Sequence, residues 1–264
     1  MLIRSRFPTK VTVGHIIGSM SPMESQNVFT ALVQLEDVDS TNKELRRRFD
    51  ENTSEFFAVT ALHQTSGLGR LGRTWVTESA KSMALSILLK PQSQSQIDWI
   101  TIMTGLAVRS CLSDHGVSAK IKWPNDVLVS GKKISGILAE LIDTNSVIIG
   151  IGLNLDPQDG SPDTAVSLSE LGVSIALPDL IQAVGKSIRD YWQKLAADPK
   201  AAIAEFQMEL KEHCSTLGSE VRAELPGGKN IYGLATAIDQ EGKLVVECPE
   251  PVVLAAADVW HLRN

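Results

Sequence analysis

The most distinctive chemistry in this 264-residue sequence lies in a loop that combines three glycines with two arginines. Residues 67–73 read GLGRLGR and follow an apolar run that is typical of a strand. Glycines let the backbone approach a ligand closely, while Arg70 and Arg73 can present planar donor forks to a carboxylate or a phosphate. The loop therefore indicates an anion-binding site. A solvated turn with two surface arginines is the alternative.

The same loop matches the GxGxxG spacing of dinucleotide-binding folds, but its context does not. That fingerprint should open a helix and be followed by an acidic residue about 20 positions later. Here the sequence after Gly72 is not a helix start, and the region around Pro91 offers only Gln, Ser and Pro. The sequence therefore argues against a Rossmann site.

A second polar cluster, residues 122–126, reads KWPND and is followed seven residues later by Lys133. A proline between an aromatic residue and two Asx residues is typical of a rigid turn. Lys132 and Lys133 are neighbours, so on a strand they face opposite sides and only one can point into a site. Gly136 could leave room there for a ligand. A structural corner followed by solvated lysines is the alternative.

The charges of the chain are distributed unevenly. It holds 25 Lys and Arg against 31 Asp and Glu, a net charge of −6. Residues 64–90 and 118–136 each hold four basic residues against one acidic residue, or +3 per segment, so the rest of the chain carries −12. This concentration favours an anionic ligand, whereas the acidic total argues against a dedicated nucleic-acid-binding protein.

Composition also bounds the class of protein. The chain is 43% hydrophobic and 21% charged, which is ordinary for a globular protein. Its three cysteines, at positions 111, 214 and 248, show no paired spacing and indicate a reducing compartment. No apolar stretch is long enough for a membrane span or a signal peptide. We therefore expect a cytoplasmic protein without membrane contact.

Hydrophobic periodicity predicts the elements that position these motifs. Thr41 and Glu44 have the spacing of a capping box, so a helix should begin at Ser40 or Thr41, where plain capping could also explain Ser40 and Asn42. Apolar runs predict strands at 31–38, 56–62 and 81–89, and helices at 97–117, 177–195 and 200–214. Residues 119–155 read as a meander of antiparallel strands, and residues 219–264 as short strands of a small barrel.

The order and spacing of the motifs resemble those of biotin protein ligases over residues 35 to 170. The motifs that carry the resemblance are Ser40-Thr41-Asn42, residues 64–75 (QTSGLGRLGRTW), residues 122–126, Lys133 with Gly136-Ile137-Leu138, and residues 150–154 (GIGLN). The resemblance implies an α/β (α+β) fold. A catalytic domain like that of class II aminoacyl-tRNA synthetases, with a mixed sheet, would cover residues 1–216, and an SH3-like β-barrel residues 217–264. Residues 1–28 would be an extension of unassigned role.

The resemblance also implies a reaction. Biotin and ATP, with Mg²⁺, would form biotinyl-5′-AMP, and the amine of a specific lysine on the biotin carboxyl carrier domain of an acyl-CoA carboxylase would then accept the biotin. A lipoate or other cofactor-protein ligase of the same fold is the enzymatic alternative, and a non-catalytic biotin-sensing regulator is another. Family members pair through sheet edges, so a homodimer is an open question.

The resemblance assigns roles to individual residues. Lys133 and Arg70 would be catalytic, with Lys133 bridging the biotin carboxylate and the α-phosphate. Biotin would be bound by Ser40, Thr41, Asn42, Gln64, Gly67, Leu68, Gly69, Arg70 and Lys133. ATP would be bound by Arg70, Arg73, Trp75, Asn125, Asp126, Lys133 and Asn154.

The sequence differs in two ways from other members of the family that it resembles. Leu68 stands where the family usually has Arg, which would weaken the hold on the intermediate. Longer members carry an N-terminal DNA-binding domain, whereas fewer than 40 residues precede Ser40 here. We therefore expect a monofunctional ligase that does not bind DNA; its metal ligands are not assigned.

Overall fold

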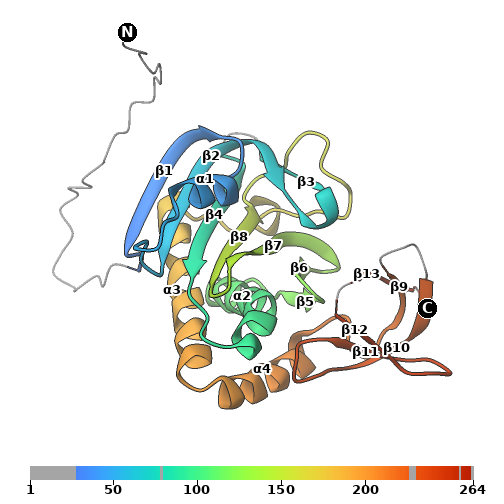
Figure 1. Ribbon diagram of the computed structural model, residues 1–264. Helices are drawn as coiled ribbons and strands as arrows, with labels where there is room; N and C mark the ends of the chain where they lie inside the picture. Colours follow the sequence, from blue (N-terminus) through green and yellow to red (C-terminus); the bar gives the residue numbers. More distant parts are fainter. Residues whose placement is uncertain (1–27, 78–79, 226–229, 256, 263–264) are drawn as a thin grey trace, which may run out of the picture.

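The computed structural model describes residues 28–77, 80–225, 230–255 and 257–262. Within them, a mixed sheet with four α-helices forms one unit, and a smaller antiparallel sheet follows it (Figure 1). The expected extension at residues 1–28 falls, apart from Val28, outside the described residues. None of the helices in the described ranges is long and apolar enough to cross a membrane.

The large sheet has the strand order β1-β2-β4-β8-β7-β6-β5, with β3 paired to β2. The first two strands are parallel and all other neighbours are antiparallel, so the sheet is mixed as expected. Its strands are β1 (Ala31–Val38), β2 (Phe57–Leu68), β3 (Thr74–Thr77), β4 (Ser82–Leu89), β5 (Lys120–Lys122), β6 (Asp126–Val129), β7 (Lys132–Asp143) and β8 (Ser146–Asn154).

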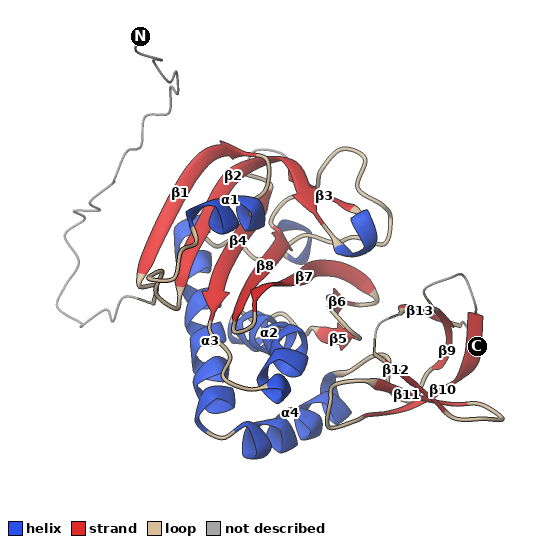
Figure 2. Ribbon diagram, in the orientation of Figure 1, coloured by secondary structure: helices blue, strands red, loops and turns tan. Residues whose placement is uncertain are grey.

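Helices cover both faces of this sheet, as Figure 2 shows. They are α1 (Thr41–Arg48), α2 (Gln94–Asp114), α3 (Leu177–Ala197) and α4 (Pro199–His213). Leu45 of α1 packs on one face against Val59, Leu88 and Ile148. The intervening residues of the central strands point to the opposite face and join the main core with α2 and α3. Because β4 is covered on both faces, all of its residues are buried and most of them are apolar.

The smaller sheet has the order β12-β11-β10-β9-β13 and is antiparallel. Its strands are β9 (Glu220–Glu224), β10 (Asn230–Ile238), β11 (Leu244–Glu247), β12 (Val252–Leu254) and β13 (Asp258–His261). It lies beside α4 and the β5–β6 end of the large sheet (Figure 1). Two indoles hold it there, because Trp99 donates to the carbonyl of Gln240 at 2.7 Å and Trp123 to that of Gly242 at 2.9 Å.

Most expected elements are confirmed, including the meander and its Ser130-Gly131 turn. Both turn residues have positive φ, 49° and 80°, as a two-residue hairpin turn of type I′ requires. The short strands β3 and β13 were not expected. The expected capping box is wrong, because the Thr41 hydroxyl instead donates to Gln64, 3.2 Å away, and Ser40 makes no side-chain cap.

Candidate active site

A cavity of about 290 Å³ opens on the face of the large sheet that carries α1. Its walls come from the start of α1, the loop after β2, strands β6 to β8, and β13 of the smaller sheet. The structure thus brings together segments that are distant in sequence. The predicted site residues that line it are Ser40, Thr41, Asn42, Gln64, Leu68, Gly69, Arg70, Arg73, Trp75, Asn125, Asp126 and Lys133.

Glycines form the floor of the cavity. Gly136 of β7 and Gly152 of β8 are register partners, and the Trp75 ring lies over both. A Cβ at Gly136 would lie 3.0 Å from that ring, and one at Gly150 would lie 3.0 Å from the side-chain carbon of the Asn42 amide. Larger residues at these positions would therefore displace side chains of the site. The room expected for a ligand over Gly136 is largely taken up by Trp75 and the Lys133 side chain.

One end of the cavity is a buried hydrogen-bond network. The backbone N–H of Thr41 donates to Gln64 Oε1 at 2.8 Å. Ser86 Oγ lies 2.8 Å from Thr41 Oγ1 and 2.6 Å from Asn42 Oδ1. Asn42 in turn donates through Nδ2 to Glu140 Oε2 at 2.7 Å. The network fixes side chains that can hydrogen-bond a neutral polar ligand.

Sequence reasoning missed two members of this network, Ser86 and Glu140. Ser86 is fully buried in strand β4, where six of the eight residues are apolar. Buried hydroxyls are almost always hydrogen-bonded, so a serine within an apolar run is the signal that could have identified it. Glu140 is partly exposed and carries no comparable signal.

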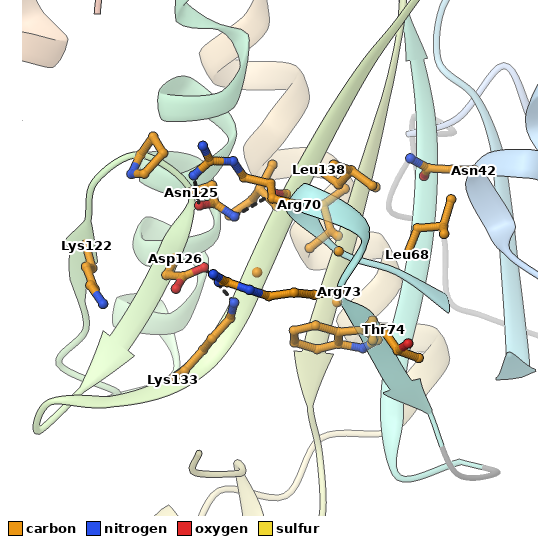
Figure 3. Close-up of a pocket in the computed structure, with 18 of the residues that line it drawn as sticks. Asn42, Leu68, Arg70, Arg73, Thr74, Lys122, Asn125, Asp126, Lys133 and Leu138 are labelled. Atoms are coloured by element: carbon orange, nitrogen blue, oxygen red, sulfur yellow. Dashed lines mark hydrogen bonds and ion pairs between the residues drawn. The ribbon is translucent and has the colours of Figure 1, made fainter. Parts of the chain in front are cut away.

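The other end of the cavity is cationic (Figure 3). Arg70 donates to Asn125 Oδ1 at 3.0 Å, and Asn125 is itself held by a hydrogen bond of 3.0 Å to the carbonyl of Ile137. Lys133 Nζ lies 2.6 Å from Asp126 Oδ1 and 5.5 Å from the centroid of the Trp75 ring. Burial lowers the pKa of Arg70 from its ordinary value, while nearby carboxylates oppose that shift.

A β-bulge decides which lysine enters the cavity. Val127 pairs with Ser135 but Leu128 pairs with Lys133, so Ile134 is an extra residue on β7. This insertion lets Ile134 join the core while Lys133 points to the same side as Gly136. Lys132 is exposed. The expectation that only one of the two lysines enters the site is met, and that lysine is Lys133.

Two predicted site residues, Asn154 and Gly67, do not line the cavity but help to position the backbone of residues that do. Asn154 donates through Nδ2 to the carbonyls of Lys133 at 3.3 Å and Val166 at 3.0 Å, which fixes the strand that carries the lysine. A Cβ at Gly67 would lie 2.9 Å from Gln64 Nε2 and still closer to the backbone of Trp75. The missing side chain of Gly67 therefore permits the close β2–β3 pairing behind the loop.

Sequence reasoning also missed the contribution of the smaller sheet. Ala257, Asp258, Val259 and Trp260 line the cavity, and Asp258 forms an ion pair with Arg73. Nothing local marks these residues, because the contact joins positions 185 residues apart. Among the described residues, the lining holds four cations, Arg70, Arg73, Lys122 and Lys133, against two carboxylates, Asp126 and Asp258. It can therefore take up an anionic ligand.

Comparison with known proteins gives consistent results. Residues 35–156 match the family model described as the biotin/lipoate A/B protein ligase family, and residues 216–262 match that of the biotin protein ligase C-terminal domain. The chain is 34% identical over 234 residues to the biotin–[acetyl-CoA-carboxylase] ligase of Mycobacterium tuberculosis, covering 85% of this chain and 86% of that protein.

Two further relatives agree. The bifunctional ligase/repressor BirA of Bacillus subtilis is 32% identical over 231 residues, which cover 81% of this chain and 69% of that protein. A biotin protein ligase from Aquifex aeolicus, solved in complex with biotin and ATP, superposes with a TM-score of 0.75 at 28% identity and covers 89% of this chain and 100% of that chain. Together with the cavity, these similarities show that the chain belongs to the biotin protein ligase family.

Proposed function

We propose that this protein activates biotin with ATP and transfers it to a lysine of the biotin carboxyl carrier domain of an acyl-CoA carboxylase. The observation that carries the proposal is the layout of one cavity, in which the Thr41–Gln64 network and the Lys133–Asp126 pair lie at opposite ends. Relatives named biotin–[acetyl-CoA-carboxylase] ligase, and a structural neighbour solved with biotin and ATP, support it.

In this proposal the polar end binds the ureido ring of biotin. Ser40, Thr41, Asn42 and Gln64 are buried, and the last three are pre-positioned by hydrogen bonds. Leu68, which also lines the cavity, offers apolar cover to the carbon chain of biotin. The ligand's carboxylate would then point toward Lys133.

At the cationic end the ligand carboxylate oxygen attacks the α-phosphorus of ATP, and the bond to the departing pyrophosphate breaks. Lys133 would leave Asp126 to bridge the carboxylate and the α-phosphate. Arg70, Arg73 and the neighbouring Trp75, Asn125 and Asp126 would hold the nucleotide, with Asn154 keeping the Lys133 backbone in place. Fixed cations aimed at developing negative charge are the main source of such catalysis.

The second step needs no protein nucleophile. The neutral amine of the acceptor lysine attacks the carbonyl carbon of biotinyl-AMP, an amide bond forms, AMP leaves, and the amine proton passes to solvent. Positioning of the two reactants supplies much of the rate enhancement.

Magnesium would enter with ATP. In the described part of the chain, no group of three or more His, Cys, Asp or Glu side chains could hold a metal ion. Mg²⁺ usually relies on substrate phosphates and one or two carboxylates, and Asp126 and Asp258 are the carboxylates of the cavity lining. The donor set therefore suits MgATP rather than a resident metal.

We further place the catalytic domain at residues 1–216 and the C-terminal domain at residues 217–264. The β-rich pattern begins there, with β9 starting at Glu220. We place the enzyme in the cytoplasm, where acyl-CoA carboxylases would supply its carrier partner. Whether it acts as a homodimer is open to measurement by analytical ultracentrifugation with and without biotin.

We predict that Arg70→Gly releases the intermediate. The Arg70 guanidinium lines the cavity and is fixed by Asn125, so its loss opens the loop and removes one cation from the site. Biotinyl-AMP should appear free in solution, with its dissociation at least about tenfold faster, since charged hydrogen bonds contribute about 1.5–3 kcal/mol each. Rapid filtration of single-turnover mixtures measures this. Unchanged retention would count against the role.

The decisive test of the proposal is an incubation of the protein with MgATP, a biotin carboxyl carrier domain, and either biotin or lipoate. Intact mass spectrometry of the carrier should show a gain of one biotinyl group, and none when its target lysine is replaced by arginine. Transfer of lipoate alone would instead identify a lipoate ligase, and binding of biotin without any transfer would identify a biotin sensor.

A further inference from the structure

Within the part of the smaller sheet that the structure describes, Asp258 is the residue that brings a formal charge to the cavity lining. It begins β13, pairs in register with Glu224 of β9, and forms an ion pair with Arg73. Its side chain is 20% exposed, whereas that of Arg73 is 61% exposed. The carboxylate is thus part of a paired strand, and the more exposed partner is the arginine of the glycine-rich loop.

The charge of Asp258 reaches further than this contact. For Arg70, burial lowers the pKa, and Asp258 is the strongest of the nearby charges that oppose the shift. For Lys122, burial again lowers the pKa, and Asp126 and Asp258 both oppose it. Asp258 thus pairs directly with Arg73 and, through its charge, favours the protonated forms of Arg70 and Lys122.

The ion pair is not needed to attach the smaller sheet to the large one. The indoles of Trp99 and Trp123 bond directly to the β10–β11 turn. The backbone N–H of Trp123 also donates to Thr216 Oγ1 at 3.1 Å, and His261 Nε2 of β13 lies 3.3 Å from the same oxygen. Strand β13 is itself held by four register pairs with β9. An ion pair whose arginine is mostly exposed adds little to such an interface, which points to a role toward the ligand.

We propose that Asp258 is an internal competitor of the nucleotide phosphates: it pairs with Arg73 in the ligand-free protein, and the phosphates of ATP take its place on that arginine. The inference rests on the proposed function for the identity of its ligand. Asp258 thereby sets the affinity for ATP and couples nucleotide binding to the contact between β13 and Arg73. Coupling between two sites is reciprocal. A contact that stabilises the Asp258–Arg73 pair therefore weakens ATP binding by the factor by which ATP weakens that pair.

Asp258→Asn tests the proposal, because it removes the charge but keeps the size of the side chain. Calorimetric titration should give an affinity for MgATP about two- to fivefold tighter than that of the wild type, in keeping with a partly exposed ion pair. Adenosine, which lacks phosphates, should bind both proteins equally, as should biotin. Asp258→Glu, which restores the charge, should return the affinity for MgATP toward the wild-type value.

Two controls sharpen the result. Glu250→Gln removes an exposed carboxylate in the loop between β11 and β12, outside the cavity lining, and should change nothing. In an Arg73→Ala background, the gain from Asp258→Asn should shrink, because the main contact of Asp258 is already gone. If Asp258→Asn still raised the affinity for MgATP by the full amount in the Arg73→Ala protein, Asp258 would not compete with the phosphates for Arg73.

The role of Asp258 and the proposed biotin ligase activity can be refuted independently of each other. If Asp258→Asn weakens MgATP binding or leaves it unchanged while the wild type biotinylates its carrier, Asp258 orients Arg73 or is passive, and only the inference is lost. Inorganic tripolyphosphate provides a probe that is independent of nucleotide chemistry. If Asp258→Asn tightens its binding but no biotin is ever transferred, the internal competitor stands and the proposed function is lost.

Discussion

Lys133→Ala is expected to abolish formation of biotinyl-AMP while the protein stays folded. Lys133 is the cation that the β-bulge directs into the cavity, between Asp126 and the Trp75 ring. Loss of a preorganised group that meets charge in the transition state typically costs about 10²- to 10³-fold in rate. Pyrophosphate release in the presence of biotin and ATP measures the effect.

The chain offers a closely matched control in the preceding residue. Lys132 has the same side chain on the same strand but is exposed, so Lys132→Ala should retain wild-type activity. Both variants should keep the wild-type melting temperature to within a few degrees, because Asp126 can be solvated when its partner is removed: 22% of its side chain is exposed. Normal pyrophosphate release by Lys133→Ala, or a large loss in Lys132→Ala, would refute the assignment.

Gly152→Ala is expected to damage both the site and the stability of the fold. A Cβ at Gly152 would overlap the Trp75 indole, with 2.7 Å to its nitrogen and less to two of its ring carbons. The ring cannot retreat easily, since it also packs over Gly136, so the β3 strand and the loop before it must shift. Overpacking of this kind typically costs about 1–3 kcal/mol, and we expect adenylate formation to fall at least about tenfold through misplacement of the loop.

Gly105→Ala is the control for this substitution. A Cβ there would meet only the methyl ends of Ile121 and Ile137, at 3.4 and 3.8 Å, and alanine is favoured over glycine within a helix by about 1 kcal/mol. Thermal unfolding should therefore show a neutral or slightly raised midpoint for Gly105→Ala and a lowered one for Gly152→Ala. If Gly152→Ala kept the wild-type midpoint and activity, Trp75 would not be fixed against the sheet as the structure has it.

Local elements of the fold could be predicted because their signals are local. Strand β1 occupies the expected residues 31–38, and the Ser130-Gly131 turn joins the expected strands, since both follow from short-range preferences. The unexpected strands β3 and β13 have four residues each. Segments so short carry too little periodicity to be recognised and depend on their partners β2 and β9 for pairing.

The candidate site likewise has features that local sequence signals could predict and features that depend on distant contacts. Motif order alone singled out residues that the structure gathers around one cavity, from Thr41 to Lys133. The error at the start of α1 has a tertiary cause: the Thr41 hydroxyl that would cap an isolated helix is bonded to Gln64, 23 residues away. Capping rules describe a helix end by its near neighbours, and here a distant partner competes for the same hydroxyl.

By itself the sequence determined the class of fold, the family and the chemistry that its arginines and lysines can perform. Residue type and spacing are sufficient for those, because they set charge, donor geometry and local backbone preference. The motif pattern already pointed to Lys133, and the tertiary structure supplied the bulge that turns it into the cavity. Only the tertiary structure decided that Ser86 and Glu140 hold the polar end and that Asp258 meets Arg73. These depend on a bulge and on contacts between distant segments, which local preferences do not encode.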